Sequence, residues 1–432
     1  MLIEFSVENF RSIKEKVTLS MVASSDKSLE NNLIESDVLK KDKLLRSAVL
    51  YGANASGKSN VIMALGFLRN LVMNSHKHQK GDKINCTPFK LDEEYVSNPS
   101  KFEVVFIKND IKYIYGLSVT GEKVVDEYLY YYPGSRRAAI FQRSSTDKYK
   151  FTVDKKQQEF ISQRTLDNVL YLSKSTQENY DKTSEVFEWF KDDLGVMGPT
   201  DHPALRDFTA RLLDSQFKPI ILKALSEADL GINDVSASIE KIKLDDKFDD
   251  LPPDAPQELK DVFQAIKKLD DSVGRKEIEK VEIKMLHKVL GKEGKELSIP
   301  FNFNEESEGT QRLFSIIGSW IEALVNGSIL VVDELDTKLH HKLNVFLIKL
   351  FHDPTQNINN AQLIFTTHNT NLLDLDLFRR DQIWFTEKNQ DSGSTELYSL
   401  VEFSPRKDEN IQKGYIWGRY GAIPFIKENK IF

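Results

Sequence analysis

The sequence predicts an α/β fold in which a buried parallel sheet is joined by an antiparallel side sheet and a mostly helical insertion. Three observations lead to this fold class. Short apolar runs typical of buried parallel strands occur at Ser47–Tyr51, Ile329–Val332 and Leu363–Thr367. Alternating strand patterns follow the first run, and helical spacing then dominates up to the second. Polar residues follow each of the three runs directly.

The first buried run leads into a glycine-rich loop, Gly52-Ala-Asn-Ala-Ser-Gly-Lys-Ser59, and residues 60–74 then place apolar side chains on one helical face. Between a strand and a helix this G-x-x-x-x-G-K-S pattern predicts a phosphate site, because the glycines let N–H groups turn inward and the helix N-terminus adds donors. Lys58 can reach the β- and γ-phosphates, and the Ser59 hydroxyl can hold Mg²⁺. The alternative is a turn that contains Gly-Lys-Ser by chance. The candidate nucleotide-binding residues here are Gly52, Asn54, Ser56, Gly57, Lys58, Ser59 and Asn60.

The other two buried runs end in Asp333-Glu334 and in His368. Since ligands bind at the carboxyl ends of parallel strands, we expect these residues at the same sheet edge as the loop. Asp333 is suited to hold Mg²⁺ opposite Ser59, and Glu334 to orient and deprotonate an attacking water. His368 is suited to sense the γ-phosphate. The alternatives are a helix N-cap for the two acids and a structural role for the histidine. We interpret His340-His341 as structural, because adjacent helical residues point about 100° apart.

A second candidate anion site is Ser307-Glu-Gly-Thr310, where a hydroxyl and a glycine precede a strongly amphipathic helix. The same residues would also make an ordinary helix cap. The residue types at this position fit both interpretations equally.

We expect three parts: 1–165 as the first half of one domain, 166–295 as a mostly helical insertion that includes a helix at 258–269, and 296–432 as the second half. The antiparallel side sheet is expected from alternating patterns at Phe102–Ile107, Ile111–Val119 and Lys123–Tyr132.

Composition restricts the class of protein. The 432 residues carry a net charge of −7, so no general basic surface for nucleic acid is expected. Arg136-Arg137 with Arg143, and Arg379-Arg380, are local candidates for DNA contact, or simply solvated surface. One cysteine, no signal-peptide pattern and no apolar stretch of about 20 residues lead us to expect a cytoplasmic protein without a membrane span.

The order of these motifs resembles the ATP-binding-cassette ATPases of the SMC, RecF and OLD kind. The resemblance covers Asn9-Phe10-Arg11-Ser12, Gly52–Ser59, Ser307–Thr310, Ile329–Glu334 and His368. It implies an ABC-ATPase-like P-loop NTPase head that uses ATP and Mg²⁺. It also implies that Arg11 is a nucleotide-binding residue, that Lys58, Glu334 and His368 are catalytic, and that Asp336 occupies the D-loop position.

In that family the Ser-x-Gly element acts in trans, and two heads enclose two ATP molecules. The resemblance therefore implies that Ser307 and Gly309 contact the nucleotide of a partner copy, in a homodimer or higher homo-oligomer. Two departures stand out: the usual Leu-Ser-Gly-Gly-Gln signature is reduced to 306–310, and the only candidate for a Q-loop is the segment at 88–90.

The tail 413–424 and the segment 307–312 resemble the stand-alone bacterial anti-phage ATPases of the RloA and AbiLi type, and more distantly the AriA ATPase of the PARIS system. This implies a sensor or regulatory subunit that controls a separate RloB-like or Toprim-type nuclease and responds to a phage protein. The 64 residues after His368 (369–432) are too few for a fused Toprim nuclease. The alternatives are a DNA repair or recombination ATPase that binds DNA itself, and a nucleotide-locked scaffold without turnover.

Overall fold

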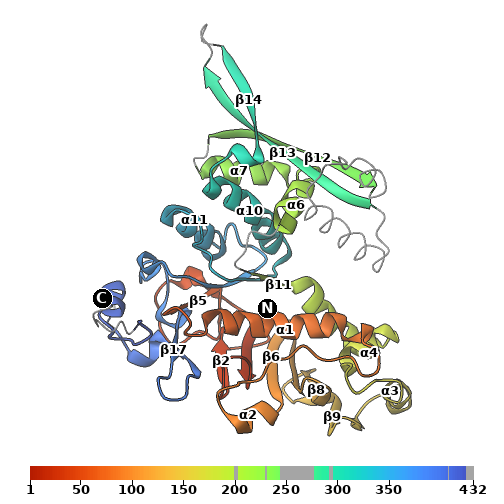
Figure 1. Ribbon diagram of the computed structural model, residues 1–432. Coiled ribbons are helices and arrows are strands. Elements are labelled where there is room, and N and C mark those ends of the chain that lie inside the picture. Colours follow the sequence, from red (N-terminus) through yellow and green to blue (C-terminus); the bar gives the residue numbers. More distant parts are fainter. Residues whose placement is uncertain (199–202, 229–230, 244–276, 291–294, 407, 425–432) are drawn as a thin grey trace, which may run out of the picture. The chain divides into compact units, whose positions relative to one another are not determined.

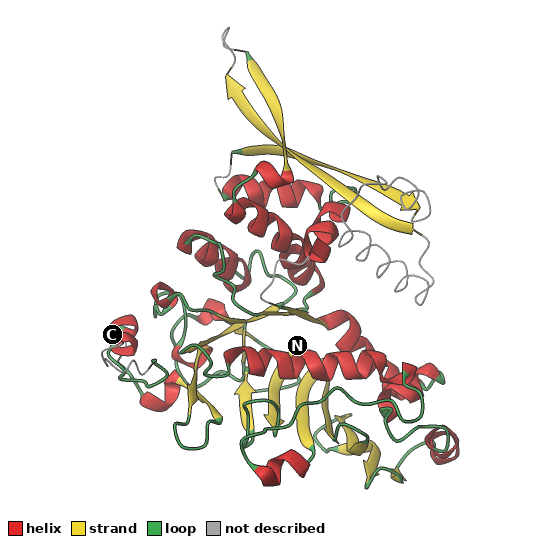
Figure 2. Cartoon of the chain, viewed as in Figure 1, coloured by secondary structure: helices red, strands yellow, loops and turns green. Residues whose placement is uncertain are grey.

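The computed structural model describes residues 1–198, 203–228, 231–243, 277–290, 295–406 and 408–424 (Figure 1). The chain divides into two compact units. Unit 1 comprises residues 1–200 and 322–432, and unit 2 comprises residues 201–321. The division falls within helix α10 (Glu308–Asn326). Both units mix helices and strands (Figure 2).

Unit 1 contains a six-stranded sheet in the order β11-β15-β16-β5-β17-β18. Every neighbouring pair is parallel except β17 with β18. The three buried runs predicted from the sequence are adjacent strands here, with β16 between β5 and β15, and all of their residues are buried. Their carboxyl ends therefore share one edge. The strands are β5 (Ser47–Gly52), β11 (Leu194–Met197), β15 (Ile329–Val332), β16 (Gln362–Thr366), β17 (Ile383–Lys388) and β18 (Thr395–Ser399).

A seven-stranded antiparallel sheet forms the other layer of unit 1, in the order β10-β9-β8-β7-β6-β1-β2. Its three central strands follow the alternating patterns of the sequence. Strand β1 pairs with β6, almost a hundred residues further along the chain. The strands are β1 (Leu2–Glu8), β2 (Val17–Ser20), β6 (Ser100–Lys108), β7 (Ile111–Val119), β8 (Val124–Tyr132), β9 (Ala138–Ser144) and β10 (Lys148–Phe151).

Helix α1 (Lys58–Asn74) packs between these two sheets. It contacts β5, β16 and β11 on the parallel sheet and β1 on the antiparallel one. Val61, Leu65, Leu68 and Val72 are buried in a core that both sheets share. The helix that follows the glycine-rich loop is therefore fixed from both sides, which holds the loop in place.

Residues 166–200 belong to unit 1, which differs from the predicted insertion boundary at 166. The reason is β11: this four-residue strand pairs in parallel with β15, so the chain returns to the central sheet before it leaves for unit 2. Trp189 also stacks on Phe106 of β6 at 4.1 Å between ring centroids. The helices here are α3 (Lys155–Ser162), α4 (Tyr171–Gln177), α5 (Asp181–Glu188) and the π-helical turn η3 (Trp189–Asp193).

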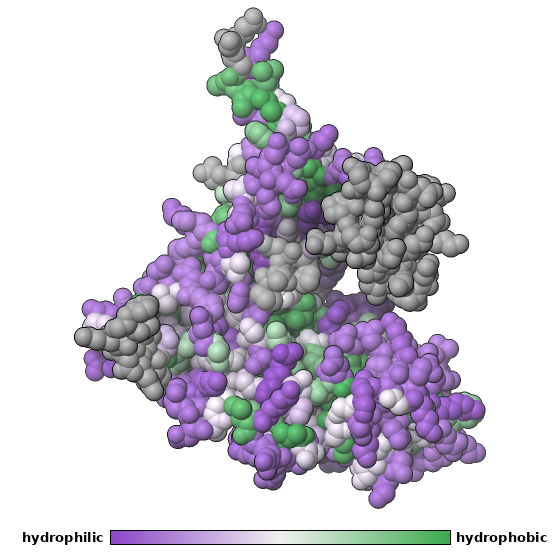
Figure 3. All heavy atoms as spheres, viewed as in Figure 1, coloured by the Kyte–Doolittle hydropathy of each residue, from purple (hydrophilic) through white to green (hydrophobic). Residues whose placement is uncertain are grey.

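Unit 2 contains a three-stranded antiparallel sheet as well as helices, so the insertion is less uniformly helical than expected. The sheet order is β12-β13-β14. Figure 3 shows an apolar patch on the strand pair β13–β14. The exposed apolar side chains of these two strands are Val289, Leu290, Leu297, Ile299 and Phe301. The expected helix at 258–269 lies outside the described residues. The elements of unit 2 are α6 (Pro203–Leu212), α7 (Lys218–Glu227), β12 (Ile232–Lys243), β13 (Glu277–Leu290), β14 (Glu296–Asn302), η4 (Phe303–Glu305) and most of α10.

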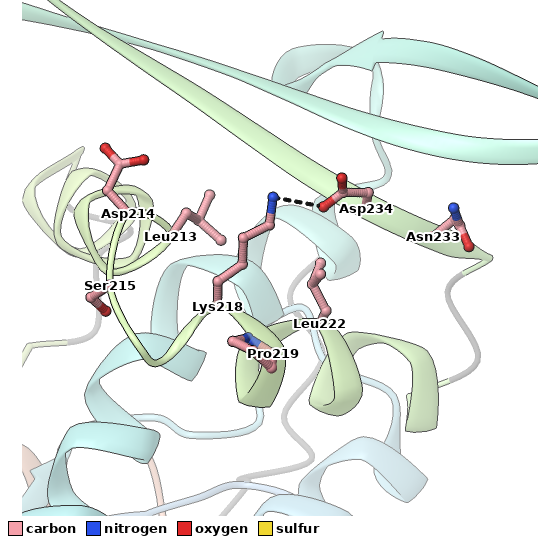
Figure 4. Close-up of a pocket in the computed structure, with 8 residues that line it drawn as sticks. All are labelled: Leu213, Asp214, Ser215, Lys218, Pro219, Leu222, Asn233 and Asp234. Carbon is pink, nitrogen blue, oxygen red and sulfur yellow. Dashed lines mark ion pairs between the residues drawn. The ribbon is translucent and has the colours of Figure 1, made fainter.

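An open hollow of about 630 Å³ lies between the α6–α7 turn and β12 in unit 2 (Figure 4). Lys218 Nζ lies 2.9 Å from Asp234 Oδ1 there, so the two main charges already neutralise each other. None of the site residues predicted from the sequence lines it. The lining residues are Leu213, Asp214, Ser215, Lys218, Pro219, Leu222, Asn233 and Asp234.

The C-terminal tail packs on β17 of unit 1. Tyr415 and Tyr420 both stack on Phe385, with ring centroids 5.5 and 5.9 Å apart. The remaining elements of unit 1 are α2 (Glu93–Ser97), α11 (His341–His352), α12 (Ile411–Ile416), β3 (Leu33–Ile34), β4 (Leu44–Leu45), η1 (Glu30–Asn32), η2 (Ser75–Lys77), η5 (Thr370–Leu372), η6 (Arg380–Gln382) and η7 (Leu400–Phe403).

Candidate nucleotide-binding site

The glycine-rich loop runs from the end of β5 to the start of α1, as the motif predicts. Gly57 is the N-cap of α1 and has φ 109°, in the region that favours glycine. A side chain at Gly57 would collide with Thr395, and one at Gly52 would collide with Thr386. The two glycines therefore allow the strands β17 and β18 to approach the loop closely. Asn54 and Ala55 at the tip of the loop are exposed.

Lys58 is 5% exposed, and its ammonium group lies inside the curve of the loop. Nζ donates to the carbonyl oxygens of Gly52 at 2.8 Å and of Ala53 at 3.1 Å. Burial lowers the pKa of Lys58 to about 8, and the nearby carboxylates of Asp333, Glu334 and Asp336 oppose this shift. The lysine of the loop and the acids after β15 are therefore close enough to influence each other electrostatically.

Asp333 and Glu334 follow β15, and the end of β16 holds both. The Thr366 hydroxyl donates to Asp333 Oδ1 at 2.6 Å and accepts the Glu334 N–H at 2.7 Å. Asp333 is 2% exposed, whereas Glu334 is partly exposed. Glu334 has φ 54°, a left-handed conformation that costs energy in a non-glycine residue and is typical of functional sites.

His368 lies at the same edge, two residues beyond β16. Its backbone N–H faces the Asp336 carboxylate at 3.2 and 3.4 Å, and its imidazole is exposed. The structure thus brings His368 and Asp336 to the edge that Glu334 occupies. Nearby, His340 is the N-cap of α11 and accepts the Lys342 N–H at 3.3 Å. This is a structural role, as the sequence indicated.

The N-terminal turn reaches the loop through Ser12. Asn60 Nδ2 donates to Ser12 Oγ at 2.6 Å, and Ser12 Oγ lies 2.7 Å from Thr395 Oγ1. Arg11 is exposed, and its backbone N–H donates to the Thr87 carbonyl at 2.9 Å. Ser12 is thus the residue of this turn that is bonded to α1 and β18, next to the loop. Arg11 stays a candidate nucleotide-binding residue on the resemblance alone.

Ser307 and Gly309 lie in unit 2, at the start of α10. The Ser307 hydroxyl accepts the Thr310 N–H at 3.1 Å and lies 2.8 Å from Thr310 Oγ1. Ser307 therefore acts as a helix cap within its own chain, one of the two roles left open by the sequence. Its role toward a partner's nucleotide stays a prediction.

Four residues near the loop were missed or only partly recognised: Ser12, Thr366, Thr386 and Thr395. Ser56 Oγ lies 2.6 Å from Thr386 Oγ1, and Thr395 Oγ1 donates to the Ser56 carbonyl at 2.9 Å. The position of Thr366 could have been recognised from the sequence, since it ends one buried run and Asp333 directly follows another. Thr386 and Thr395 carried none, because the order of β17 and β18 in the sheet is not visible in the sequence.

Two of the arginines considered for DNA contact are buried, so those candidates were wrong. Arg143 is 2% exposed, donates to the Val169 carbonyl at 2.7 Å and lies 3.8 Å from Glu127. Arg379 is fully buried and pairs with Asp381 at 2.7 Å. Arg379 also donates to the carbonyl oxygens of Ser28 and Ser24, so each guanidinium group joins separate segments of the chain and has the partners that a buried cation requires.

A buried lysine inside a glycine-rich loop, with two acids that follow another parallel strand of the same sheet, defines a P-loop nucleotide-binding protein. The family model described as "AAA domain, putative AbiEii toxin, Type IV TA system" matches residues 47–374, and the chain belongs to this AAA domain family. The match runs from β5 to just beyond His368. No curated protein matches the sequence significantly. Within the described residues, no helix combines the length and apolar character that a membrane crossing requires.

Proposed function

We propose that this protein binds and hydrolyses ATP with Mg²⁺, and that it is the sensor or regulatory subunit of a bacterial anti-phage, abortive-infection system. The observation that carries the ATPase proposal is the position of Lys58, enclosed by loop carbonyls and close to Asp333, Glu334 and Asp336. A buried ammonium group without a direct carboxylate bond is available to an anionic ligand. Phosphate oxygens would replace the two carbonyl acceptors.

The residues present fit ATP and Mg²⁺. Lys58 and the N–H groups at the start of α1 would hold the phosphates, and Ser59 with Asp333 would hold Mg²⁺. The bound nucleotide supplies an electrophilic γ-phosphoryl group, and the metal neutralises its charge. Thr366 keeps the Asp333 carboxylate in place. Glu334 would orient the attacking water and accept its proton, and His368 would sense the γ-phosphate.

The second part of the proposal is assembly. Ser307 and Gly309 of one copy would contact the nucleotide held by the partner copy, so that ATP joins a homodimer or a larger homo-oligomer. The exposure of Ser307 supports this, because the hydroxyl can still be reached while it caps α10. The cycle of binding and hydrolysis would then control a separate nuclease, either RloB-like or Toprim-type, with a phage protein as trigger. The description of the family, which refers to a toxin–antitoxin system, supports a role in defence.

Three measurements test the proposal, two on the purified wild-type protein and one on a variant. Phosphate release that depends on Mg²⁺ should be observed, and its absence would favour a scaffold locked by nucleotide. A nuclease should co-purify with the Glu334→Gln variant in ATP. If the protein alone instead shifts duplex DNA with a strong dependence on salt, the regulatory role would give way to that of a DNA repair ATPase.

A further inference from the structure

Three hydrogen bonds link α1, the N-terminal turn and β18 to the glycine-rich loop in one directed chain. Asn60 Nδ2 donates to Ser12 Oγ at 2.6 Å, Ser12 Oγ lies 2.7 Å from Thr395 Oγ1, and Thr395 Oγ1 donates to the Ser56 carbonyl at 2.9 Å. The Thr395 hydroxyl donates its one proton to the Ser56 carbonyl, so the Ser12 hydroxyl must donate to Thr395 Oγ1. Bonds that follow one another in this way polarise and strengthen each other.

The last bond of this chain fixes the orientation of one peptide plane. The carbonyl and N–H of a trans peptide point in opposite directions. Because the Ser56 carbonyl is turned toward Thr395, the Gly57 N–H points away from β18. Gly57 is the N-cap of α1, and the first N–H groups of a helix have no acceptor within the helix. Thr395 thus keeps a donor free for an anion.

Close packing holds the same peptide from two sides. A side chain at Gly57 would collide with Thr395, so the threonine lies directly against the backbone. Ser56 Oγ lies 2.6 Å from Thr386 Oγ1, and Thr386 Oγ1 donates to the Tyr51 carbonyl at 3.3 Å. Thr395, Thr386 and Ser56 are all buried. Water is therefore poorly placed to replace a lost hydroxyl.

We propose that Thr395, supported by Ser12, is a positioning residue that orients the Ser56–Gly57 peptide for binding nucleotide phosphate. This inference rests on the proposed ATP site. Thr395 lies outside all of its motifs, and Ser12 ends the Asn9–Ser12 motif, in which only Arg11 was expected to bind nucleotide. Without the hydroxyl, the Ser56 carbonyl would lose its buried donor, and rotation of the peptide would aim an oxygen at the phosphates. Because Thr395 N also donates to the Ser12 carbonyl at 2.7 Å, the N-terminal turn is joined to β18 by two bonds, and Thr395 in turn binds the phosphate loop.

The test is the Thr395→Val variant, which keeps the shape of the side chain and removes the hydroxyl. We expect the affinity for ADP and for ATP to fall about tenfold, as a buried carbonyl without a donor would cause. The value of kcat should stay near that of the wild type while KM rises, because this N–H would bind phosphate equally in the ground and transition states. Thr395→Ser should restore the affinity.

Thr183→Val is a closely matched control. Thr183 in α5 is also buried, donates to a backbone carbonyl (Tyr180 O) at 2.9 Å and lies 2.8 Å from a serine hydroxyl (Ser175). It should lower the Tm without changing nucleotide affinity. Hydrogen exchange of the nucleotide-free protein gives a second readout. Amides 53–57 should exchange faster in Thr395→Val and at the wild-type rate in Thr183→Val.

Unchanged affinity and unchanged loop exchange in Thr395→Val would overturn the inference, as would an equal loss of affinity in Thr183→Val. If the wild type bound neither ADP nor ATP, the proposed function would fail instead, and the exchange data would still decide whether Thr395 holds the loop. Ser12→Ala should weaken binding about threefold alone and add little to Thr395→Val, because both break one chain. If the losses of binding free energy in Ser12→Ala and Thr395→Val added fully in the double variant, Ser12 would not act through Thr395.

Discussion

Thr366 holds Asp333: the hydroxyl of the threonine donates to Oδ1 of the aspartate at 2.6 Å. The two residues end neighbouring parallel strands, with Val332 paired to Phe365 in the register of β15 and β16. The same hydroxyl accepts the Glu334 N–H, so one side chain holds both the carboxylate of Asp333 and the backbone of Glu334. The sheet itself, rather than a loop, therefore fixes the proposed metal ligand and the proposed base.

Thr366→Val should weaken Mg²⁺-dependent turnover about 10–100-fold, in the range known for lost partners of metal ligands. The reason is that Asp333 would keep its charge and lose its orientation. Binding of ADP without Mg²⁺ should stay close to that of the wild type, and Thr366→Ser should behave like the wild type. Steady-state phosphate release over a Mg²⁺ titration measures the effect. Equal Mg²⁺ dependence in Thr366→Val and the wild type would contradict it.

Glu334→Gln should nearly abolish turnover, with a loss of about 10²–10⁴-fold, because the amide cannot accept the proton of the attacking water. ATP binding should remain, so the variant should accumulate as ATP-bound assemblies. Single-turnover hydrolysis and size-exclusion chromatography in ATP provide the measurements. Hydrolysis at the wild-type rate would remove Glu334 from the role of base.

Local patterns were enough to predict which residues meet at one edge of the parallel sheet. An apolar run of four or five residues followed by acids, or by a glycine-rich loop, identifies a buried strand and its functional end without further information. Asp333, Glu334, Lys58 and His368 follow this rule, and the structure places them at one edge.

Residues that depend on strand order could not be predicted in this way. Thr386 and Thr395 lie more than 300 positions after Ser56, and only the pairing of β17 with β5 brings them to the loop. Strand β11 was missed for a different reason. Its four residues directly follow a π-helical turn, so the helical pattern before it hides the change. For the same reason, the predicted start of the insertion at residue 166 differs from the division of the chain after residue 200.

Nucleotide binding should take up a proton above pH 8. Burial lowers the pKa of Lys58 to about 8 in the free protein, so the lysine is increasingly neutral at higher pH. Phosphate oxygens favour the charged form, so binding must return the proton, and affinity should fall by up to about tenfold for each pH unit above that pKa. Calorimetry in buffers of different ionisation enthalpy measures the uptake. Lys58→Arg, which stays charged, should bind with a flat pH profile, and a slope as steep as that of the wild type would contradict the assignment.

Ser307→Arg should abolish turnover and assembly while one subunit still binds nucleotide. The bulky cation would block a contact with the partner's nucleotide, but unit 1 of the same chain would keep its own loop and acids. Binding of a fluorescent ADP and the oligomeric state in ATP separate the two effects. Loss of ADP binding as well would show that the element does not act in trans. A matched control is Ser298→Arg in β14, an exposed serine of unit 2 outside the motif, which should leave assembly intact.

The stability of unit 1 should fall as the pH drops below about 6.5, and His352 should account for part of this loss. Burial lowers the pKa of His352 to about 3. Arg46 and Lys349 add to this lowering of the pKa. The groups beside Nε2 of the ring are the neutral Ser47 hydroxyl at 2.7 Å and Gln382 Nε2 at 3.4 Å, and neither offers the negative charge that would stabilise an added proton. The orientation of Gln382 is fixed, because its Oε1 accepts from Asn32 at 2.7 Å and from the Arg379 N–H at 2.8 Å.

The unfolded chain binds this proton near pH 6.5 and the folded chain does not. His352 therefore makes its full contribution to the free energy of unfolding above pH 6.5. This free energy falls by about 1.4 kcal/mol per pH unit as the pH drops toward 3. Between pH 6.5 and pH 5 this amounts to about 2 kcal/mol. His352→Gln keeps an acceptor without the titration, so its urea midpoint should fall less over the same interval than that of the wild type. Parallel pH profiles for the two proteins would show that His352 is not the titrating group.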